Sequence, residues 1–312
     1  MKTTIIKAIC LFCFLACHSV FAQLPELKKD DLVKNIRLHE NKISAFYMKY
    51  KLSGSFKPDE LDKEKFVPHL IIEFEYARYI TKGYWYLHEK WVTLTKGQEY
   101  ERKYAHDGKT GTRLVLKLPD DPNRMYGYIT NKMPDIFNDE ALWKPKLSTY
   151  EFIDTNDSLS AIIEKDSNAE VTIEEFNDEH VYRTFFSIPY DIEFTNPQTG
   201  KKQTIEARDK YAAWLSPKKS YLPVKISRLL GEEVEGTSFC LASDFREIEP
   251  GIWLPWHIER YRRAEQRPYY VIDVNSIALN EKATVISRLK FPDGTRVRDE
   301  ISGIRYLSYG EE

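Results

Sequence analysis

Apolar and polar residues alternate along several long stretches of the chain. Every second residue is apolar around Phe46, Met48 and Tyr50, and residues 70–77 repeat the pattern. A period of two is that of a strand with one buried face. In residues 84–91 both alternating sets carry aromatic side chains, so the inward face of this segment stays open. The pattern predicts a mainly β protein.

The segment 24–42 has a different period and predicts a helix. Its apolar residues, including Leu32, Val33 and Ile36, recur near 3.6 residues among charged ones. We expect these three side chains to pack over the sheet, as a plug that competes with a ligand. A second, short helix is expected at 135–143.

Turn residues separate the predicted strands and favour antiparallel pairing. Asp107-Gly108, residues 196–200 and residues 292–295 each lie between two strand-like runs. Such turns are typical of β-hairpins, and about ten strands are expected. The predicted fold is a large curved antiparallel sheet, or open half-barrel, packed on the two helices. We expect residues 23–312 to form one domain, with an insertion near 119–150.

Residues 1–22 have the layout of a secretory signal peptide. A basic start precedes the apolar core 8–16, and small or permissive residues lead to a cleavage point between Ala22 and Gln23. The core is too short to span a bilayer. We therefore expect an exported protein, periplasmic or secreted, whose mature chain has no transmembrane span. In the alternative, Cys17 ends a lipobox-like segment and carries a lipid anchor.

Composition adds an excess of aromatic residues and removes nucleic acid as a partner. Lys and Arg total 46 against 48 Asp and Glu, so no basic surface is indicated. The 20 Tyr, 16 Phe and 6 Trp are more than a thin sheet easily hides. We predict an apolar ligand cavity on the concave face of the sheet, with an ordinary packed core as the alternative. The residues expected to line it are Phe46, Met48, Tyr50, Phe74, Tyr76, Trp214, Trp253 and Trp256.

The sequence lacks the common enzyme motifs, and no cofactor or metal is expected. There is no H-E-x-x-H, no Gly-rich phosphate loop and no nucleophile elbow. Cys240 is expected to be a small buried residue. Glu247 and Glu249 fall on one face of a predicted strand, as in some β-sandwich glycosidases, but the third acid of that pattern is missing. A glycan-directed hydrolase or sugar-binding module is therefore an alternative function.

Several segments together resemble the LolA/LolB-type lipoprotein-carrier superfamily. After the signal peptide and amphipathic helix come a strand with Phe46, Met48 and Tyr50, and later Trp-Leu-Ser-Pro at 214–217 and Leu-Pro-Val-Lys-Ile at 222–226. The resemblance implies an open half-barrel, covered by helices, that holds acyl chains of lipoproteins in the periplasm. It implies a non-enzymatic protein, with a lipid, a lipoprotein acyl chain or an envelope protein as partner. A structural envelope protein without a ligand is a further alternative.

Overall fold

The computed structural model describes residues 24–54, 68–121, 123–131, 157–195, 197–198, 200–230, 234–262 and 267–309. The expected signal peptide, with Ala22, Gln23 and Cys17, lies outside these ranges, and so does the helix expected at 135–143. In the described ranges no helix is long and apolar enough to cross a membrane.

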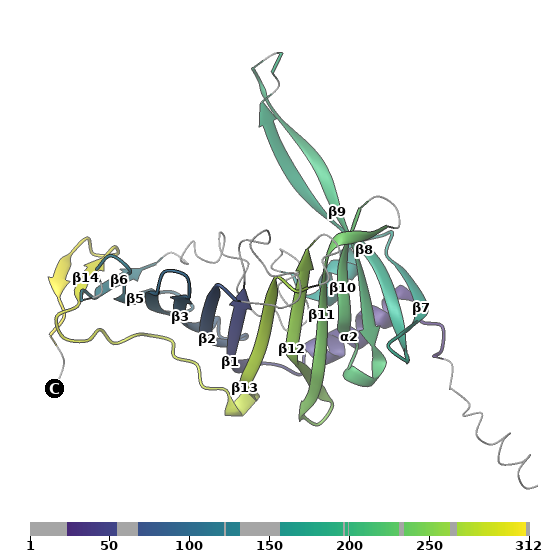
Figure 1. Cartoon of the computed structure of the whole chain (residues 1–312), viewed down its shortest axis with the longest axis horizontal. Coiled ribbons are helices and arrows are strands. Elements are labelled where there is room, and N and C mark those ends of the chain that lie inside the picture. Colours follow the sequence, from purple (N-terminus) through teal and green to yellow (C-terminus); the bar gives the residue numbers. More distant parts are fainter. Residues whose placement is uncertain are drawn as a thin grey trace, which may run out of the picture.

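Fifteen strands of the described residues form one open, curved sheet, more than the ten or so expected (Figure 1). The first half is a meander of β1 (Ala45–Gly54), β2 (Leu70–Tyr79), β3 (Tyr84–Thr93), β4 (Gln98–Asp107), β5 (Gly111–Lys117) and β6 (Tyr126–Thr130). The second is a meander of β7 (Glu170–Phe176), β8 (Glu179–Thr195), β9 (Lys202–Ser216), β10 (Leu222–Leu230), β11 (Val234–Glu249), β12 (Ile252–Arg262) and β13 (Tyr270–Leu279).

Pairing of β1 with β13 joins the two halves into one sheet. The short strands β14 (Arg296–Asp299) and β15 (Arg305–Leu307) extend its edge beyond β6. The recorded pairings are antiparallel except that of β14 with β6. The predicted mainly β fold with a large open antiparallel sheet is confirmed.

Two α-helices pack together on one face of this sheet, α2 (Lys29–Glu40) and α4 (Leu159–Lys165). Two short 3-10 turns are η3 (Pro217–Lys219) and η4 (Asn280–Lys282). Helix α2 begins later than the expected start at residue 24, with Asp30 and Asp31 in its first turn, where acidic side chains favour a helix N-terminus. The sequence analysis did not predict α4.

Two of the three predicted hairpins are confirmed and one is wrong. Asp107-Gly108 turns β4 into β5, and residues 196–200 lie between β8 and β9. Residues 283–295 are not a strand paired with β14; they form what we call the C-terminal strap. The strap covers one face of the first half with Leu289, whose backbone N–H donates to Thr112 Oγ1 at 3.0 Å. Leu289 is thus buried without joining a ladder, whereas Ile286 of the strap is 43% exposed.

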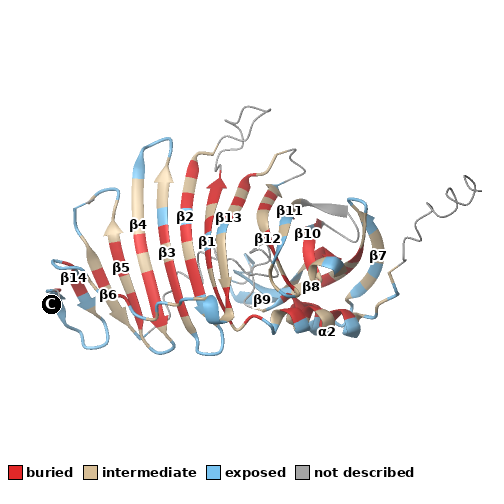
Figure 2. Ribbon diagram, turned by 90° about the horizontal axis from the view of Figure 1, so that it is seen from below, coloured by how far each residue is buried: buried red, intermediate tan, exposed pale blue. Residues whose placement is uncertain are grey.

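In several strands buried residues occur in both alternating sets, so parts of the sheet are packed on both faces (Figure 2). We call the face that packs against α2 and α4 the inner face; it holds the largest apolar cluster. The opposite, outer face holds two smaller clusters, one under the C-terminal strap and one on the strands β8 to β10. The larger cluster is where the sequence places the candidate site.

Candidate functional site

Five of the eight residues expected to line a cavity lie together on the inner face of β1 and β2. Phe46, Met48, Tyr50, Phe74 and Tyr76 are at most 6% exposed. Tyr50 stacks on Phe74 with ring centroids 4.7 Å apart, and Phe46 lies 5.3 Å from Tyr76. Because the rings come from directly paired strands, their packing follows from the strand register. They are buried in the core cluster. Whether a cavity lies above them therefore depends on the side chains that cover them.

The three tryptophans divide between the two faces. Trp253 and Trp256 on β12 are half-buried and pack against the inner cluster. Trp214 belongs instead to the outer cluster, where its Nε1–H donates to Glu174 Oε2 at 3.0 Å and Lys225 Nζ lies 4.4 Å from its ring. Its neighbours Ala213 and Leu215 on β9 belong to the inner cluster instead. Trp214 therefore does not join the other predicted residues.

Helices α2 and α4, which we call the helix pair, contribute fully buried apolar side chains to the inner cluster. Leu32, Val33 and Ile36 of α2 are 0%, 4% and 2% exposed. From α4 come Leu159, Ile162 and Ile163, also buried. The packing of Leu32, Val33 and Ile36 in the core, as expected from the sequence, is thus observed, and it makes the helix pair part of the core.

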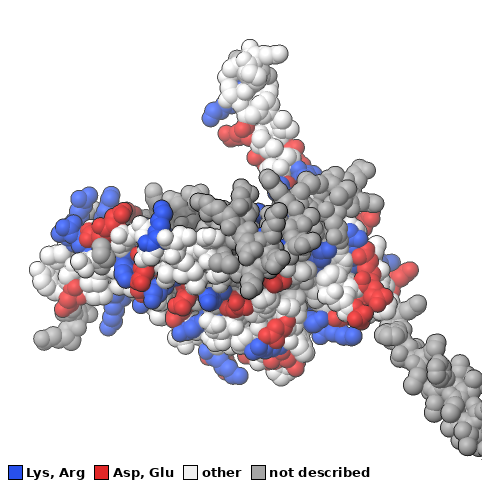
Figure 3. Space-filling model, in the orientation of Figure 1, with Lys and Arg blue, Asp and Glu red and all other residues white. Residues whose placement is uncertain are grey.

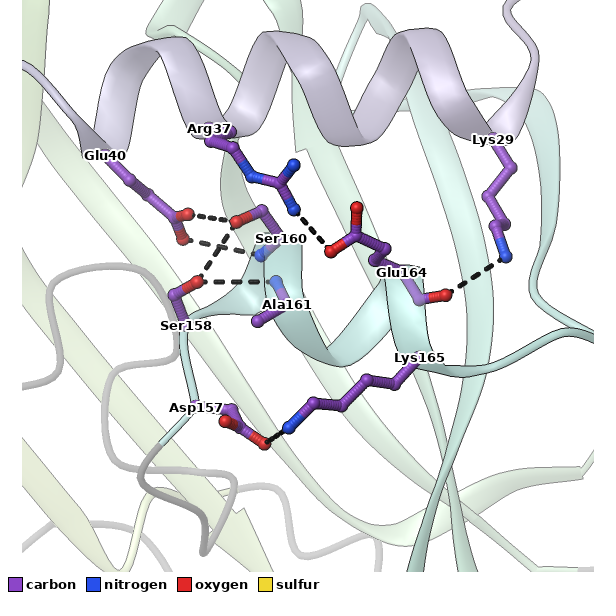
Figure 4. A network of polar contacts seen from close by, with 9 residues as sticks. All are labelled: Lys29, Arg37, Glu40, Asp157, Ser158, Ser160, Ala161, Glu164 and Lys165. Carbon is purple, nitrogen blue, oxygen red and sulfur yellow. Dashed lines mark hydrogen bonds and ion pairs between the residues drawn. The ribbon is translucent and has the colours of Figure 1, made fainter.

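Polar contacts join the two helices to each other at their surface (Figure 4). Arg37 Nη2 donates to Glu164 Oε2 at 2.6 Å, and this hydrogen bond lowers the pKa of Glu164. Lys29 Nζ donates to the carbonyl oxygens of Glu164 and Asp166 at 3.4 and 3.0 Å. Ser160 Oγ donates to Glu40 at the other end of α2. An exposed ion pair such as Arg37–Glu164 stabilises little by itself. The helices are held on the sheet mainly by burial of their apolar side chains.

Direct hydrogen bonds to the sheet come from residues that lie just after the two helices. The Asp166 carboxylate, just after α4, accepts hydrogen bonds from the backbone N–H and hydroxyl of Ser187 on β8, at 2.6 and 3.0 Å. Lys42, just after α2, donates to the carbonyl oxygen of Gly251 at 3.2 Å. The end of α4 is thereby hydrogen-bonded to β8. The end of α2 is hydrogen-bonded to the turn before β12.

An open depression of about 220 Å³ lies on the solvent side of α2. Charged and apolar side chains both line it, namely Asp30, Lys34, Arg37 and Glu164 together with Val33 and Leu38. It does not match the apolar cavity predicted from the sequence. A ligand on the inner face would have to take the place of the side chains that the helix pair puts there.

The inner face also carries a buried ion pair that the sequence analysis missed. Glu89 on β3 and Arg102 on β4 form an ion pair, with side chains 1% and 8% exposed. Trp91 Nε1–H donates to Glu89 Oε2 at 3.1 Å, and the Arg102 guanidinium lies 5.1 and 5.4 Å from the rings of Tyr100 and Tyr104. The signal was present, because Glu89 and Trp91 share one alternating set in residues 84–91.

The two acids considered for glycan hydrolysis lie near the end of β11 and accept hydrogen bonds there. Glu247 Oε1 accepts a hydrogen bond from the backbone N–H of Gly251 at 2.7 Å. Glu249 Oε2 accepts one from Asn280 Nδ2 at 3.0 Å. Each carboxylate thus has a local partner in a turn. Cys240 is fully buried, and burial raises the pKa of its thiol to about 12. Over the described part of the chain, no His, Cys, Asp and Glu side chains cluster as metal ligands do.

Comparisons with known proteins give structural likeness alone. No protein-family model matches the chain, and no curated protein matches it. Among solved structures, a domain described as a candidate outer membrane lipoprotein-sorting protein from Vibrio parahaemolyticus has a TM-score of 0.43 and 8% identity, over 81% of this chain and 94% of that one. A LolA superfamily protein from Nitrosomonas europaea has a TM-score of 0.35 and 12% identity, over 82% and 95%.

A third structure, LprF from Mycobacterium bovis, has a TM-score of 0.28 and 8% identity, over 82% of this chain and 98% of that one. The resemblance noted in the sequence thus has a counterpart among solved structures, at low TM-scores and low identity: the chain has a weak likeness to LolA-superfamily and lipoprotein-sorting domains.

Proposed function

We propose that this protein is an exported, non-enzymatic carrier that binds an acyl chain, free or attached to a lipoprotein, on the inner face of its sheet. The supporting observation is the way that face is covered. Its aromatic residues lie in one cluster with apolar side chains of two short helices, and among the polar contacts between α2 and α4 is the exposed Arg37–Glu164 pair. An acyl chain offers the same apolar surface as Leu32 and Ile36, so it can replace their contacts when α2 moves aside.

Export is supported by the signal-peptide layout of residues 1–22. An exported carrier meets lipids and lipoproteins of the envelope, where acyl chains are the available apolar ligands. The buried Glu89–Arg102 pair lies on the same face of the sheet, beside the aromatic residues of β2. The pair would give the polar head group of an acyl ligand a polar contact on this otherwise apolar face.

The test measures ligand uptake with and without a weakened helix cover. Wild-type protein is mixed with a fluorescent fatty acid, and co-purified lipid is sought by native mass spectrometry. Replacing Leu32 and Ile36 together with Ala should increase uptake of the fatty acid, because the contacts that hold α2 over the inner face are reduced. Leu38→Ala is the matched control, since Leu38 lies on the same helix but is 56% exposed; it should behave as wild type.

A sheet packed without any ligand is the second candidate, and the near-complete burial of the inner face favours it. In that case the double variant loses stability as a whole. Truncating a buried Leu or Ile to Ala typically costs about 2–5 kcal/mol. A single cooperative loss of circular dichroism at lower temperature, with no uptake of fatty acid below it, would support the packed sheet and count against the carrier.

A further inference from the structure

Strands β8 and β9 project beyond the rest of the sheet as a two-stranded hairpin (Figure 1). The pairing of β7 with β8 ends at Phe185, and that of β10 with β9 ends at Lys210. From there the two strands pair only with each other, as far as Thr195 and Lys202. We call this part the projecting hairpin. A lone two-stranded hairpin is marginally stable in water, so a surface that covers one face would stabilise it.

One face of the projecting hairpin is apolar and exposed. We call its four large side chains the apolar strip: Tyr190, Ile192, Phe194 and Ile205, which are 43%, 42%, 36% and 52% exposed. Ile192 and Ile205 lie directly opposite each other in the register. Much of the hairpin is free of charged side chains in Figure 3. Such alternation belongs to a strand with one face buried, yet here that face is open.

Most charged residues of the hairpin lie on its other face. The exception is Asp209 at the base, which lies opposite Ile188 and accepts a hydrogen bond from Arg228 at 2.6 Å. On the other face Asp191 and Glu206 are opposite each other, one position from the Ile192–Ile205 pair, and Glu193 follows on the same side. Glu206 also accepts hydrogen bonds from Arg208. The same face also carries Lys202, Arg208 and Lys210. The hairpin is therefore amphipathic across its thickness, with an apolar face and a charged face of mixed sign.

The apolar strip continues the inner face of the sheet. At the base of the hairpin Phe186 and Tyr211 stack with ring centroids 5.8 Å apart, and both belong to the inner cluster. Ile188, the next residue on that side of β8, is half-buried and packs against the same cluster. Since side chains two positions apart share a face, Tyr190 and Ile192 follow in line. Along β8 an apolar path thus leads from the core to the end of the hairpin, with Asp209 of β9 beside it at Ile188.

The size and the charges of the strip indicate what covers it. Four side chains that are about half exposed offer on the order of 300 Å² of apolar surface. A stable dimer buries about 800 Å² on each partner, so a second copy is a poor match. A lipid surface has no such minimum, and apolar side chains beside cationic ones are the usual pattern of elements that lie in the membrane interface. Lys201, just outside β9 at the end of the hairpin, is exposed, and lipid phosphates would lie beside it.

We propose that the apolar strip docks the protein on the surface of a lipid bilayer, with the charged face of the hairpin turned to water. This inference rests on the proposed carrier function and deepens it, because the strip would give an acyl chain an apolar route along β8 from the bilayer to the inner face. Docking itself requires only the hairpin, so it can be measured without ligand uptake.

The experiment is flotation of the full chain with vesicles of phosphatidylethanolamine and phosphatidylglycerol. Ile192→Glu combined with Ile205→Glu places two carboxylates in the strip and should weaken binding by about tenfold or more, since two half-buried isoleucines are lost from the lipid. Thr195→Glu combined with Thr204→Glu is the matched control. It adds the same charge to the same hairpin on its other face, and it should float almost as well as wild type.

The outcomes separate the two proposals. Flotation lost in the isoleucine variant alone supports docking, whether or not fatty acid is taken up from solution. Equal flotation of both variants, or no flotation of the wild type, overturns docking; uptake from solution by the same samples would leave the carrier function standing. If the isoleucine variant shows altered circular dichroism, Tyr190→Ser combined with Phe194→Ser replaces it, with the same two outcomes expected.

Discussion

Replacing Glu89 with Gln removes the negative charge from a buried ion pair. Glu89 and Arg102 lie directly opposite each other on β3 and β4. The amide would leave the guanidinium among the rings of Trp91, Tyr100 and Tyr104 with no counter-charge in place of the carboxylate. Breaking a buried pair by removing one partner costs about 3–5 kcal/mol. The hydrogen bond from Arg102 Nη1 to Tyr100 Oη, at 3.3 Å, and the ring contacts remain, so we expect the lower end, a loss of about 3 kcal/mol.

Urea denaturation followed by far-UV circular dichroism measures this loss. The matched control is Glu99→Gln, also on β4, which breaks the ion pair with Lys117 that is 40% exposed on both sides. It should cost far less than Glu89→Gln, because solvent screens an exposed ion pair. Replacing Glu89 and Arg102 together with Met should cost less than Glu89→Gln, because no lone charge is then buried. If Glu89→Gln proves as mild as Glu99→Gln, the reasoning from burial is refuted.

Two further predictions concern a buried histidine and a close approach of two strands. Burial, and then the charge of Lys42, lower the pKa of His39 from 6.5 to about 4. The unfolded chain binds this proton near pH 6.5 and the native chain only near 4, so stability should fall as the pH drops through that window, and His39→Gln should flatten the pH dependence of the urea midpoint. A Cβ on Gly54 would lie 2.4 Å from ring atoms of Tyr270; Gly54→Ala should therefore lower the free energy of unfolding by about 1–3 kcal/mol, and an unchanged midpoint would mean that the ring yields freely.

Strands were predictable from the sequence where the evidence is local. The alternation in β1 and β2 and the turn between β8 and β9 each involve neighbours in the chain, and the structure bears them out. The C-terminal strap was not predictable in this way. Its apolar residues satisfy a strand pattern, but an extended segment can bury side chains on the face of a sheet without pairing. Only the position of the distant Thr112, which bonds Leu289, distinguishes the two cases.

The candidate site was predictable in part, because the face of a strand is decided by distant neighbours. Five aromatic and aliphatic positions of β1 and β2 were placed together correctly, since both strands have one clear apolar set. Trp214 was not, because β9 carries apolar residues on both faces and its other face meets an outer cluster. The contact of α2 with α4 depends on Arg37 and Glu164, which are 127 positions apart. No local sequence pattern predicts a contact between residues so far apart in the chain.

The same local pattern has two different outcomes in this protein, and the difference is informative. Alternating apolar residues at Phe46, Met48 and Tyr50 are covered by the core, whereas Tyr190 and Ile192 on β8 follow the same rule and are open to solvent. Sequence alone treats both as strands with one buried face. A half-exposed Ile or Tyr keeps part of its apolar surface in water, at about 25 cal/mol per Å², for as long as nothing covers it. Exposed apolar side chains also lie near the C-terminal edge, among them Ile301, Ile304 and Tyr309. The projecting hairpin differs from that edge because its apolar strip follows the inner face of the sheet, and a bilayer is the phase that we propose covers it.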